Sequence, residues 1–316
     1  MLYFLGASLA FAGAEVSGFN KISSKGATFF DAPSAVDERI DTAWMTAAES
    51  ENDEEWIQID GPNFASKLSQ VRIINGYAKD EQSFKDYTKI KKMRVEVYEY
   101  NDKMELYPTK RSVEITLQNT PEPQMITLPK PLEVKSSTGG KYRFTITEVY
   151  KTNTENYPEN VALTEISMFL EDQPFIPKIE EEENVIEGED IFILLDESKR
   201  KSYKMTTETQ LGFDGGDNSI TRVSITPSTD RRYAKPKKVK VSVGGREVIQ
   251  ELPQKMGKKP IWIWLPSVTG YSGGSSWDTT YIQVLETYPG SKNPEVAISE
   301  ITFRALISAD PEGIDP

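Results

Sequence analysis

Short runs in which apolar and polar residues alternate constrain the fold of this chain more than any other feature of its sequence. The clearest are residues 55–59, 70–74, 93–98, 112–117 and 141–146. A period of two places successive side chains on opposite faces of a strand, whereas a helix repeats about every 3.6 residues. No stretch sustains the helical period, and Gly, Pro, Asn and Asp separate the runs. The sequence therefore predicts an all-β fold made of antiparallel sheets.

The length and one change of composition predict two domains. A chain of 316 residues exceeds the usual size of a single domain. Residues 171–190 contain Pro174 and Pro177, followed by four consecutive glutamates at 180–183. Proline removes a ladder donor and like charges resist compaction, so this segment is predicted to be an interdomain linker. We expect a first sandwich over residues 15–170, a second over 191–307 and a loose tail over 308–316.

The two predicted domains end with similar pairs of strands. Residues 142–150 and 161–169 close the first domain, and residues 281–288 and 296–303 close the second. The last run of each carries a hydroxyl residue, Glu and Ile, as Thr164-Glu165-Ile166 and Ser299-Glu300-Ile301. Such a repeat predicts two copies of one fold, of which the second has diverged.

Residues 1–14 are predicted to be a secretory signal. They are apolar, contain no ionisable side chain and end in Ala12-Gly13-Ala14, a small-x-small pattern that suits cleavage before Glu15. The usual basic start is missing, so the alternatives are a true start upstream of Met1 or a buried strand. The run is too short to span a bilayer. We expect export to the periplasm, the cell surface or the medium.

The absence of two residue types excludes much chemistry. The chain has no His and no Cys, which excludes Ser-His-Asp and Cys-His nucleophiles, zinc sites built on those residues, and disulfides. The net charge of -12 disfavours nucleic acid and anionic membrane surfaces. Carboxylate-only glycoside hydrolysis remains as an alternative, but with 49 acidic residues a neighbouring pair such as Glu54 and Glu55 has no diagnostic value. We predict a protein that is not an enzyme.

A series of motifs in the first domain resembles a known family. The motifs are Asp37 before Thr42-Ala43-Trp44, then Glu55-Trp56-Ile57, Asn75-Gly76-Tyr77, a turn from Tyr87 to Lys92, and the closing Thr164-Glu165-Ile166. In this order they resemble the discoidin family of galactose-binding-like domains, and within it the glycan-binding translocation domain of bacterial NAD glycohydrolases. The resemblance covers nearly all of residues 20–170. Together with the repeat of the closing strands, the resemblance implies two tandem galactose-binding-like jelly-roll β-sandwiches.

The resemblance also implies a structural Ca²⁺ ion in an Asp-Gly loop. Here the Gly is Glu38, which cannot adopt a positive φ as cheaply, and Arg39 adds a positive charge next to the loop. Two further departures are Ile90 for the usual Asn and Lys92 for the usual Arg. We therefore leave two possibilities open, no cofactor or a Ca²⁺ ion held by Asp37 and Asp41.

The resemblance places ligand binding in loops at one end of the sandwich. Sugar recognition needs an apolar face and convergent polar groups, both of which loops can present. The candidates in the first domain are Tyr77, Lys79, Tyr87, Lys92, Tyr150 and Asn153. Those in the second are Tyr271 and Trp277, in a loop rich in Gly and Ser. For Tyr77 and Tyr87, the alternative is a half-buried packing role with a solvated hydroxyl.

The other aromatic and basic features have structural interpretations. Trp44 and Trp56 are predicted to lie in the core. Trp262 and Trp264 share one face of a strand and the aliphatic residues around them share the other. We expect the indoles to face the core, although an exposed pair would form a stacking platform for a sugar. The basic cluster 231–238 is predicted to be a solvated hairpin end, with contact to an acidic partner as the alternative.

Together these features predict an exported, non-catalytic protein that recognises carbohydrate or another surface ligand through its loops. One alternative is a structural or adhesive protein that binds protein partners of a host or of the cell envelope. Another is a hydrolase that uses carboxylates only. The expected partner is therefore a glycan or a surface protein.

Overall fold

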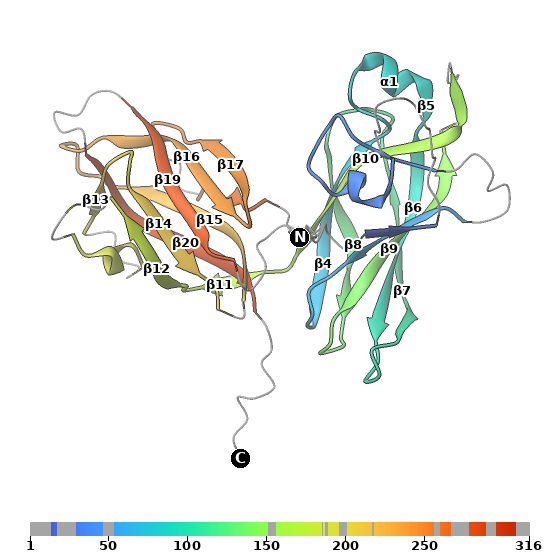
Figure 1. The fold of residues 1–316 in the computed structure, drawn as a ribbon, viewed down its shortest axis with the longest axis horizontal. Helices are drawn as coiled ribbons and strands as arrows, with labels where there is room; N and C mark the ends of the chain where they lie inside the picture. The colour runs from blue at the N-terminus through green and yellow to red at the C-terminus, as the bar shows by residue number, and fades with distance from the viewer. Residues whose placement is uncertain are drawn as a thin grey trace, which may run out of the picture. The chain divides into compact units, whose positions relative to one another are not determined.

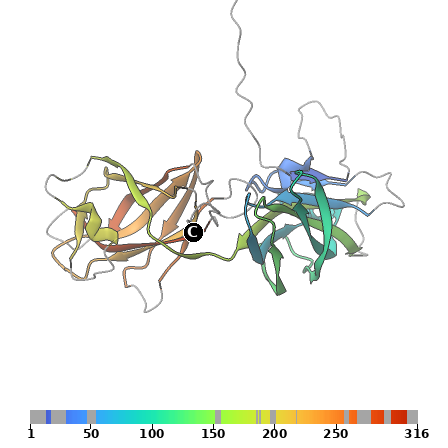
Figure 2. The same ribbon diagram turned by 90° about the horizontal axis from the view of Figure 1, so that it is seen from below.

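The structure is a computed structural model. It describes residues 14–17, 30–46, 54–150, 156–184, 186, 189–195, 201–216, 218–255, 260–266, 278–288 and 295–307. The chain divides into unit 1, which ends at Glu171, and unit 2, which begins at Asp172. Both units consist almost wholly of strands in antiparallel sheets (Figures 1 and 2), which confirms the predicted all-β fold.

Unit 1 contains two five-stranded sheets. In spatial order the first comprises β1 (Ala14–Val16), β3 (Trp56–Asp60), β9 (Gly140–Val149), β6 (Ile90–Tyr100) and β7 (Leu106–Thr116). The second comprises β2 (Trp44–Met45), β10 (Tyr157–Leu170), β4 (Ser66–Asn75) and β8 (Gln124–Val134), with β5 (Tyr87–Thr88) parallel to β10. The short helices are η1 (Ala32–Ala35) and α1 (Glu81–Asp86).

The core of unit 1 follows the predicted alternation. Along β6, the side chains of Met93, Val95 and Val97 are fully buried, while the residues between them are partly exposed. Trp44 is also fully buried, as expected. Burial of a large apolar side chain contributes about 1.5–3 kcal/mol. Trp56 contradicts its predicted core position, because the alternation along β3 places it on the outer face, under the guanidinium of Arg143.

Unit 2 also contains two five-stranded sheets. The first comprises β12 (Lys178–Glu183), β14 (Gln210–Asp214), β19 (Thr280–Tyr288), β16 (Lys235–Val243) and β17 (Arg246–Glu251). The second comprises β11 (Gln173–Phe175), β20 (Val296–Leu306), β15 (Ser219–Pro227) and β18 (Ile263–Trp264), with β13 (Tyr203–Met205) also paired to β20. Among the described residues of unit 2, the one helix is the short 3-10 helix η2 (Ile191–Leu195). The first sheet has the same spatial and chain order as the first sheet of unit 1.

The predicted linker over residues 171–190 is wrong where the structure describes it. β11 pairs with β20, and β12 pairs with β14. Ile179 packs against the core of unit 2, and β12 lies at the edge of its sheet. An edge strand has one neighbour only and tolerates charge and proline, so the glutamates do not prevent strand formation.

The expected orientation of the two indoles in unit 2 is also wrong. Ile263 and Leu265 are buried in the core, so Trp262 and Trp264 lie on the opposite face. The guanidinium carbon of Arg222 lies 4.7 Å from the centroid of Trp262 and 4.5 Å from that of Trp264. Stacking on a cation covers part of each indole and stabilises it outside the core. The proposed signal over residues 1–14 and the tail over 308–316 lie outside the described residues, except for Ala14.

Candidate functional site

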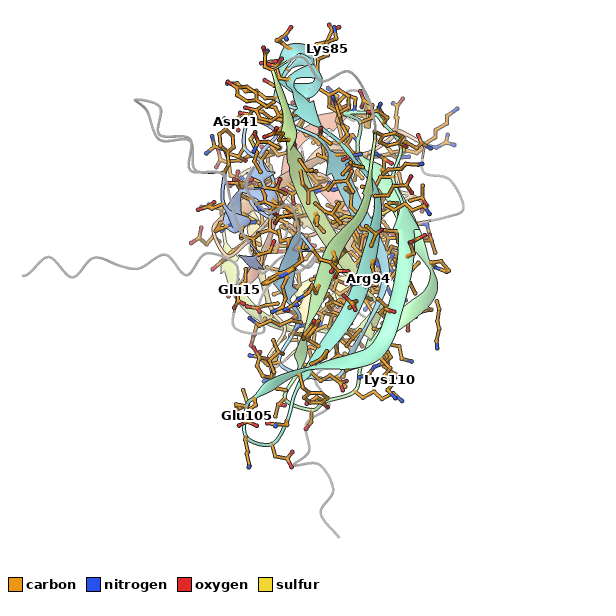
Figure 3. All side chains as sticks on the ribbon, turned by 90° about the vertical axis from the view of Figure 1, so that its right-hand side faces the viewer. Glu15, Asp41, Lys85, Arg94, Glu105 and Lys110 are labelled. Carbon is orange, nitrogen blue, oxygen red and sulfur yellow. The ribbon has the colours of Figure 1, made fainter. Side chains whose placement is uncertain are left out.

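The loop between β4 and β5 shapes one end of unit 1. Asn75 holds it, because its Nδ2 donates to the Ile90 carbonyl at 2.7 Å and its Oδ1 accepts from the Ile90 amide at 3.0 Å. Gly76 has φ +71, and a Cβ there would meet the Phe84 ring at 2.7 Å. Only glycine therefore suits this close approach. Figure 3 shows Asp41 and Lys85 toward this end of the unit and Glu105 at the opposite end.

An aromatic cluster supports this end of the unit. The Tyr77 ring meets Phe30 edge to face at 5.8 Å and Tyr87 at 5.9 Å between centroids. Tyr157 stacks on Tyr87, with centroids 4.9 Å apart and an interplanar angle of 13°. Tyr77 and Tyr87 are buried, whereas Tyr157 is 43% exposed. The cluster therefore presents Tyr157 to solvent on a buried aromatic base.

A hydrogen bond fixes Tyr77, and burial affects the hydroxyl of Tyr87. The Tyr77 hydroxyl donates to the Asp41 carbonyl at 2.9 Å. Burial raises the pKa of Tyr87 to about 12, so its hydroxyl stays neutral at physiological pH. Both residues have a packing role, but they are buried instead of half-buried, and the Tyr77 hydroxyl bonds to a backbone carbonyl instead of solvent. Their direct contact with a ligand stays a prediction.

Polar groups accompany the exposed ring. The Asn156 amide donates to the Asp86 carboxylate at 2.7 Å, and the Gln82 amide donates to the same oxygen at 2.8 Å. Lys79 is exposed just before Asp80, which caps α1 by accepting from the Ser83 amide at 2.7 Å. An apolar ring face beside amide and carboxylate groups is the combination that a sugar requires.

The remaining predicted site residues do not join this cluster. Lys92 lies on β6 and pairs with Glu114 and Glu148. The Tyr150 hydroxyl donates to the Leu117 carbonyl at 2.6 Å. These two residues belong to the first sheet, whereas Tyr77 and Tyr87 adjoin the second. Asn153, Tyr271 and Trp277 lie outside the described residues.

Sequence reasoning missed Tyr157. This tyrosine follows the polar residues 151–156 and is the first residue of β10. An aromatic residue next to a polar segment can signal a functional position, because loop ends carry recognition residues on a rigid scaffold. The stacking on Tyr87 joins positions 70 residues apart and was not visible from local patterns.

The loop that begins at Asp37 presents oxygen atoms of the kind that Ca²⁺ prefers. The Asp37 carboxylate accepts from the Thr42 hydroxyl at 2.9 Å. Glu165 on β10 is 1% exposed, and its Oε2 accepts from the Glu38 amide at 3.0 Å. Burial raises the pKa of Glu165 to about 8, and the neighbouring Asp37 adds to this rise. Burial likewise raises the pKa of Asp37.

These residues fit the ion that the resemblance implies, with one change to the predicted ligands. Asp37, Glu165 and the Thr42 hydroxyl would hold it, and its charge would let both buried carboxyls ionise. The Asp41 carboxylate instead pairs with Arg39 at 2.8 Å on the surface. The described residues contain no group of three or more acidic side chains placed to hold one metal ion, so carbonyl oxygens would complete the shell. Glu38 adopts φ +61, the conformation that the family's glycine takes readily.

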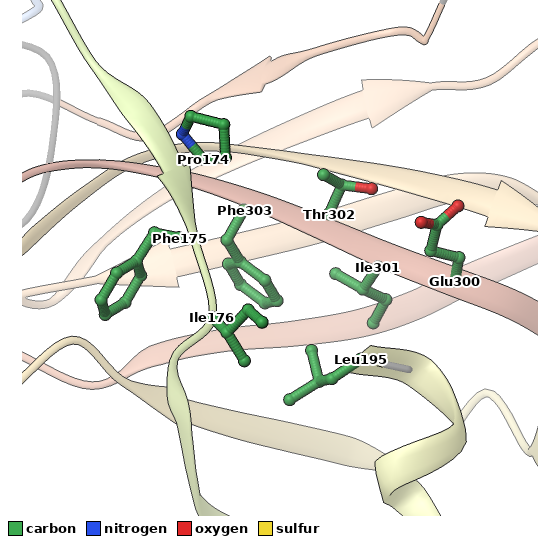
Figure 4. A pocket seen from close by; sticks show the side chains of 8 residues that line it. All are labelled: Pro174, Phe175, Ile176, Leu195, Glu300, Ile301, Thr302 and Phe303. Atoms are coloured by element: carbon green, nitrogen blue, oxygen red, sulfur yellow. The ribbon is translucent and has the colours of Figure 1, made fainter. Parts of the chain in front are cut away.

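Unit 2 contains a pocket of about 190 Å³ (Figure 4). It is lined by Pro174, Phe175 and Ile176 next to β11, by Leu195 of η2 and by residues 300–303 of β20. Glu300 is the single ionisable residue among them. Glycoside hydrolysis needs two carboxyl groups across a cleft, so this pocket does not suit that reaction.

The family comparison decides what unit 1 is. Residues 13–169 match the model of the NAD glycohydrolase translocation F5/8 type C domain. These residues form a domain of that family. The F5/8 type C domain thus includes the aromatic cluster and the Asp37 loop. No curated protein matches the chain.

Solved structures of similar domains come from several bacteria. An F5/8 type C domain from Bacteroides fragilis is 17% identical with a TM-score of 0.34, covering 51% of this chain and 91% of that one. A family 32 CBM from C. perfringens NanJ in complex with galactose is 15% identical with a TM-score of 0.31, covering 48% and 89%. The family 32 carbohydrate-binding module of Streptococcus pneumoniae EndoD is 14% identical with a TM-score of 0.31, covering 50% and 96%. Within the described part of this chain, no helix has the length and hydrophobicity of a membrane span.

Proposed function

We propose that the F5/8 type C domain of this chain binds a glycan without catalysis, at the end of unit 1 that carries Tyr157. The observation that supports this most strongly is the exposed Tyr157 ring, stacked on buried Tyr87. A ring held flat from below offers its outer face to the C–H side of a sugar at little cost in side-chain entropy. Asn156 and Asp86 add a donor and an acceptor next to it.

The cluster distributes roles among the site residues. Tyr157 contacts the sugar, while Tyr87 and Tyr77 act as positioning residues beneath it. Lys79 is an exposed cation at the same end. Together with Arg39, which has the larger effect, it lowers the pKa of the Asp41 carboxyl. The absence of His and Cys leaves carboxylates as the main candidates for acid–base chemistry. As part of this proposal, we expect a bound glycan to be released unchanged.

A glycan array with the full chain tests the proposal. Wild type should bind at least one glycan saturably, and Tyr157→Ala should reduce that binding about tenfold or more. Tyr107→Ala is the matched control, because Tyr107 is 42% exposed and Tyr157 is 43% exposed. Tyr107 lies on β7 near Glu105, which Figure 3 places at the opposite end of unit 1. Binding that survives Tyr157→Ala, or that Tyr107→Ala reduces equally, would contradict the proposal.

We also propose that unit 2 is a diverged copy of unit 1. The corresponding first sheets support this, as does a shared hydrogen bond. The Tyr150 hydroxyl donates to the Leu117 carbonyl, and the Tyr288 hydroxyl donates to the Leu252 carbonyl, both at 2.6 Å. In the sequence, Asp196 precedes Tyr203 by the same interval as Asp37 precedes Trp44. Asp196-Glu197 thus repeats the Asp37-Glu38 pair in the sequence.

Export is a further part of the proposal, supported by the apolar run over residues 1–14. Mass spectrometry of the protein from a native host would test it. A mature chain that begins at Glu15 would support export, and a retained run in cytosolic protein would contradict it.

A further inference from the structure

Tyr233 in unit 2 occupies the position that Tyr87 has in unit 1. Thr88, next to Tyr87, pairs in parallel with Val161, and Ala234, next to Tyr233, pairs in parallel with Val296. The next residues along β10 and β20 also have equivalent partners. Ala162 on β10 opposes Met45 of β2, and Ala297 on β20 opposes Lys204 of β13. The two rings therefore stand at equivalent ends of their sheets.

The surroundings of the two rings differ in charge. Tyr87 lies between two other tyrosines. Tyr233 instead has two cations near its ring. Lys204 Nζ lies 5.8 Å and the Arg232 guanidinium carbon 5.7 Å from the ring centroid. Each cation also has an acidic partner, Glu189 for Lys204 at 2.6 Å and Asp230 for Arg232 at 2.7 Å. Tyr233 thus has charged side chains as neighbours, where Tyr87 has aromatic ones.

Two further cations at this end have no acidic partner among the described residues. Arg231 is exposed and Lys235 is half-buried, and neither forms an ion pair with any residue that the structure describes. Residues 231–240 contain six Lys and Arg, but four of these pair with carboxylates outside the segment: Arg232 with Asp230, Lys237 and Lys238 with Glu286, and Lys240 with Glu247. The charges that remain to attract an anion at this end are therefore those of Arg231 and Lys235.

We propose that this end of unit 2 binds a saccharide that bears carboxylate or sulfate groups. Tyr233 supplies the ring face, and Arg231 pairs with the anionic group, which a guanidinium can hold through two parallel hydrogen bonds. Arg231 and Lys235 favour an acidic sugar over a neutral one, because Lys204 and Arg232 are already paired with Glu189 and Asp230. The saccharide nature of the ligand depends on the proposed function of unit 1, whereas the preference for an anion depends on the charges around Tyr233 alone.

Binding of the full chain to immobilised polysaccharides tests the inference. Polygalacturonate provides carboxylates, dextran sulfate provides sulfates, and dextran provides neither. We expect binding to one of the acidic polymers at physiological salt, with Arg231→Glu or Tyr233→Ala weakening it about tenfold. Arg246→Glu is the matched control, because it changes the charge equally at the other end of β16, where the β16–β17 hairpin turns.

The outcomes separate this inference from the proposed function. Loss of acidic-polymer binding in Arg231→Glu and Tyr233→Ala, with Arg246→Glu and Tyr157→Ala unaffected, supports the site. Equal loss in Arg246→Glu would show a nonspecific charge effect and contradict it. Equal affinity for duplex DNA would contradict it in the same way. Tyr157-dependent glycan binding without any acidic-polymer binding would overturn this inference alone.

Discussion

Tyr157 stacks on Tyr87 with only 13° between the ring planes, so an exposed aromatic surface stands on a buried one. Such a pair contributes about 0.5–1.5 kcal/mol beyond the area that it buries. The buried partner is fixed in turn by its contact with Tyr77. The orientation of the exposed ring is therefore set by the core and does not depend on a bound ligand.

Glu165 should make the stability of unit 1 depend on pH. Its pKa is raised from 4.5 to about 8 in the folded protein, mainly by burial. Folding then takes up a proton between these values, so the stabilisation present below pH 4.5 is lost as the pH rises toward 8. Urea unfolding in the presence of a chelator should show wild type losing up to about 1.4 kcal/mol per pH unit relative to Glu165→Gln. A difference that stays constant with pH would contradict this assignment.

Calcium should oppose that loss if Asp37 and Glu165 hold the ion. We expect added Ca²⁺ to raise the unfolding temperature of wild type at pH 7.5, but not that of Asp37→Asn or Glu165→Gln. Asp41→Asn should keep the response, because the Asp41 carboxylate is already paired with Arg39. Differential scanning calorimetry measures all four proteins. Loss of the response in Asp41→Asn alone would favour the ligand set predicted from the sequence.

Asp172 should be a sensitive position in unit 2. Its side chain is 4% exposed, and its Oδ1 accepts from Arg222 at 2.8 Å and from Arg304 at 2.5 Å. Asp172→Asn removes the charge shared by both arginines and should cost about 3 kcal/mol in the free energy of unfolding. The control Glu247→Gln breaks a more exposed pair with Lys240 and should cost less than about 1 kcal/mol. Similar costs in urea denaturation would disprove the central role of Asp172.

The sequence predicted those features that depend on local pattern. The alternation along β6 fixed both its strand character and its buried face. The strand β12 was missed because its four glutamates carry no apolar alternation, and its pairing with β14 joins distant segments. Trp262 and Trp264 define a face by themselves, but Arg222, some forty positions earlier, determines that the face lies outside the core.

The candidate site was predictable in place but not in detail. The resemblance placed Tyr77 and Tyr87 at one end of the sandwich, and the structure brings the two rings together there. It did not indicate which ring of the cluster is outermost, because that depends on how Tyr157 on β10 meets β5. Glu165 was used only as a repeat signature. Its burial beside the Asp37 loop follows from the pairing of β10 with its neighbours.

The relation between the units predicts equal effects of two equivalent substitutions. Tyr150→Phe leaves the Leu117 carbonyl without its donor, and Tyr288→Phe does the same to Leu252. Each should lower the free energy of unfolding of its own unit by about 1 kcal/mol. Thermal unfolding of both variants checks this. A cost in one unit and none in the other would argue against a shared structural role.

A structure of the full chain with the best glycan from the array bound would test the central claim most directly. The account predicts a sugar ring packed against the outer face of Tyr157, with its hydroxyl groups near Asn156 and Asp86. A sugar bound elsewhere on unit 1, with the Tyr157 ring still open to solvent, would contradict it.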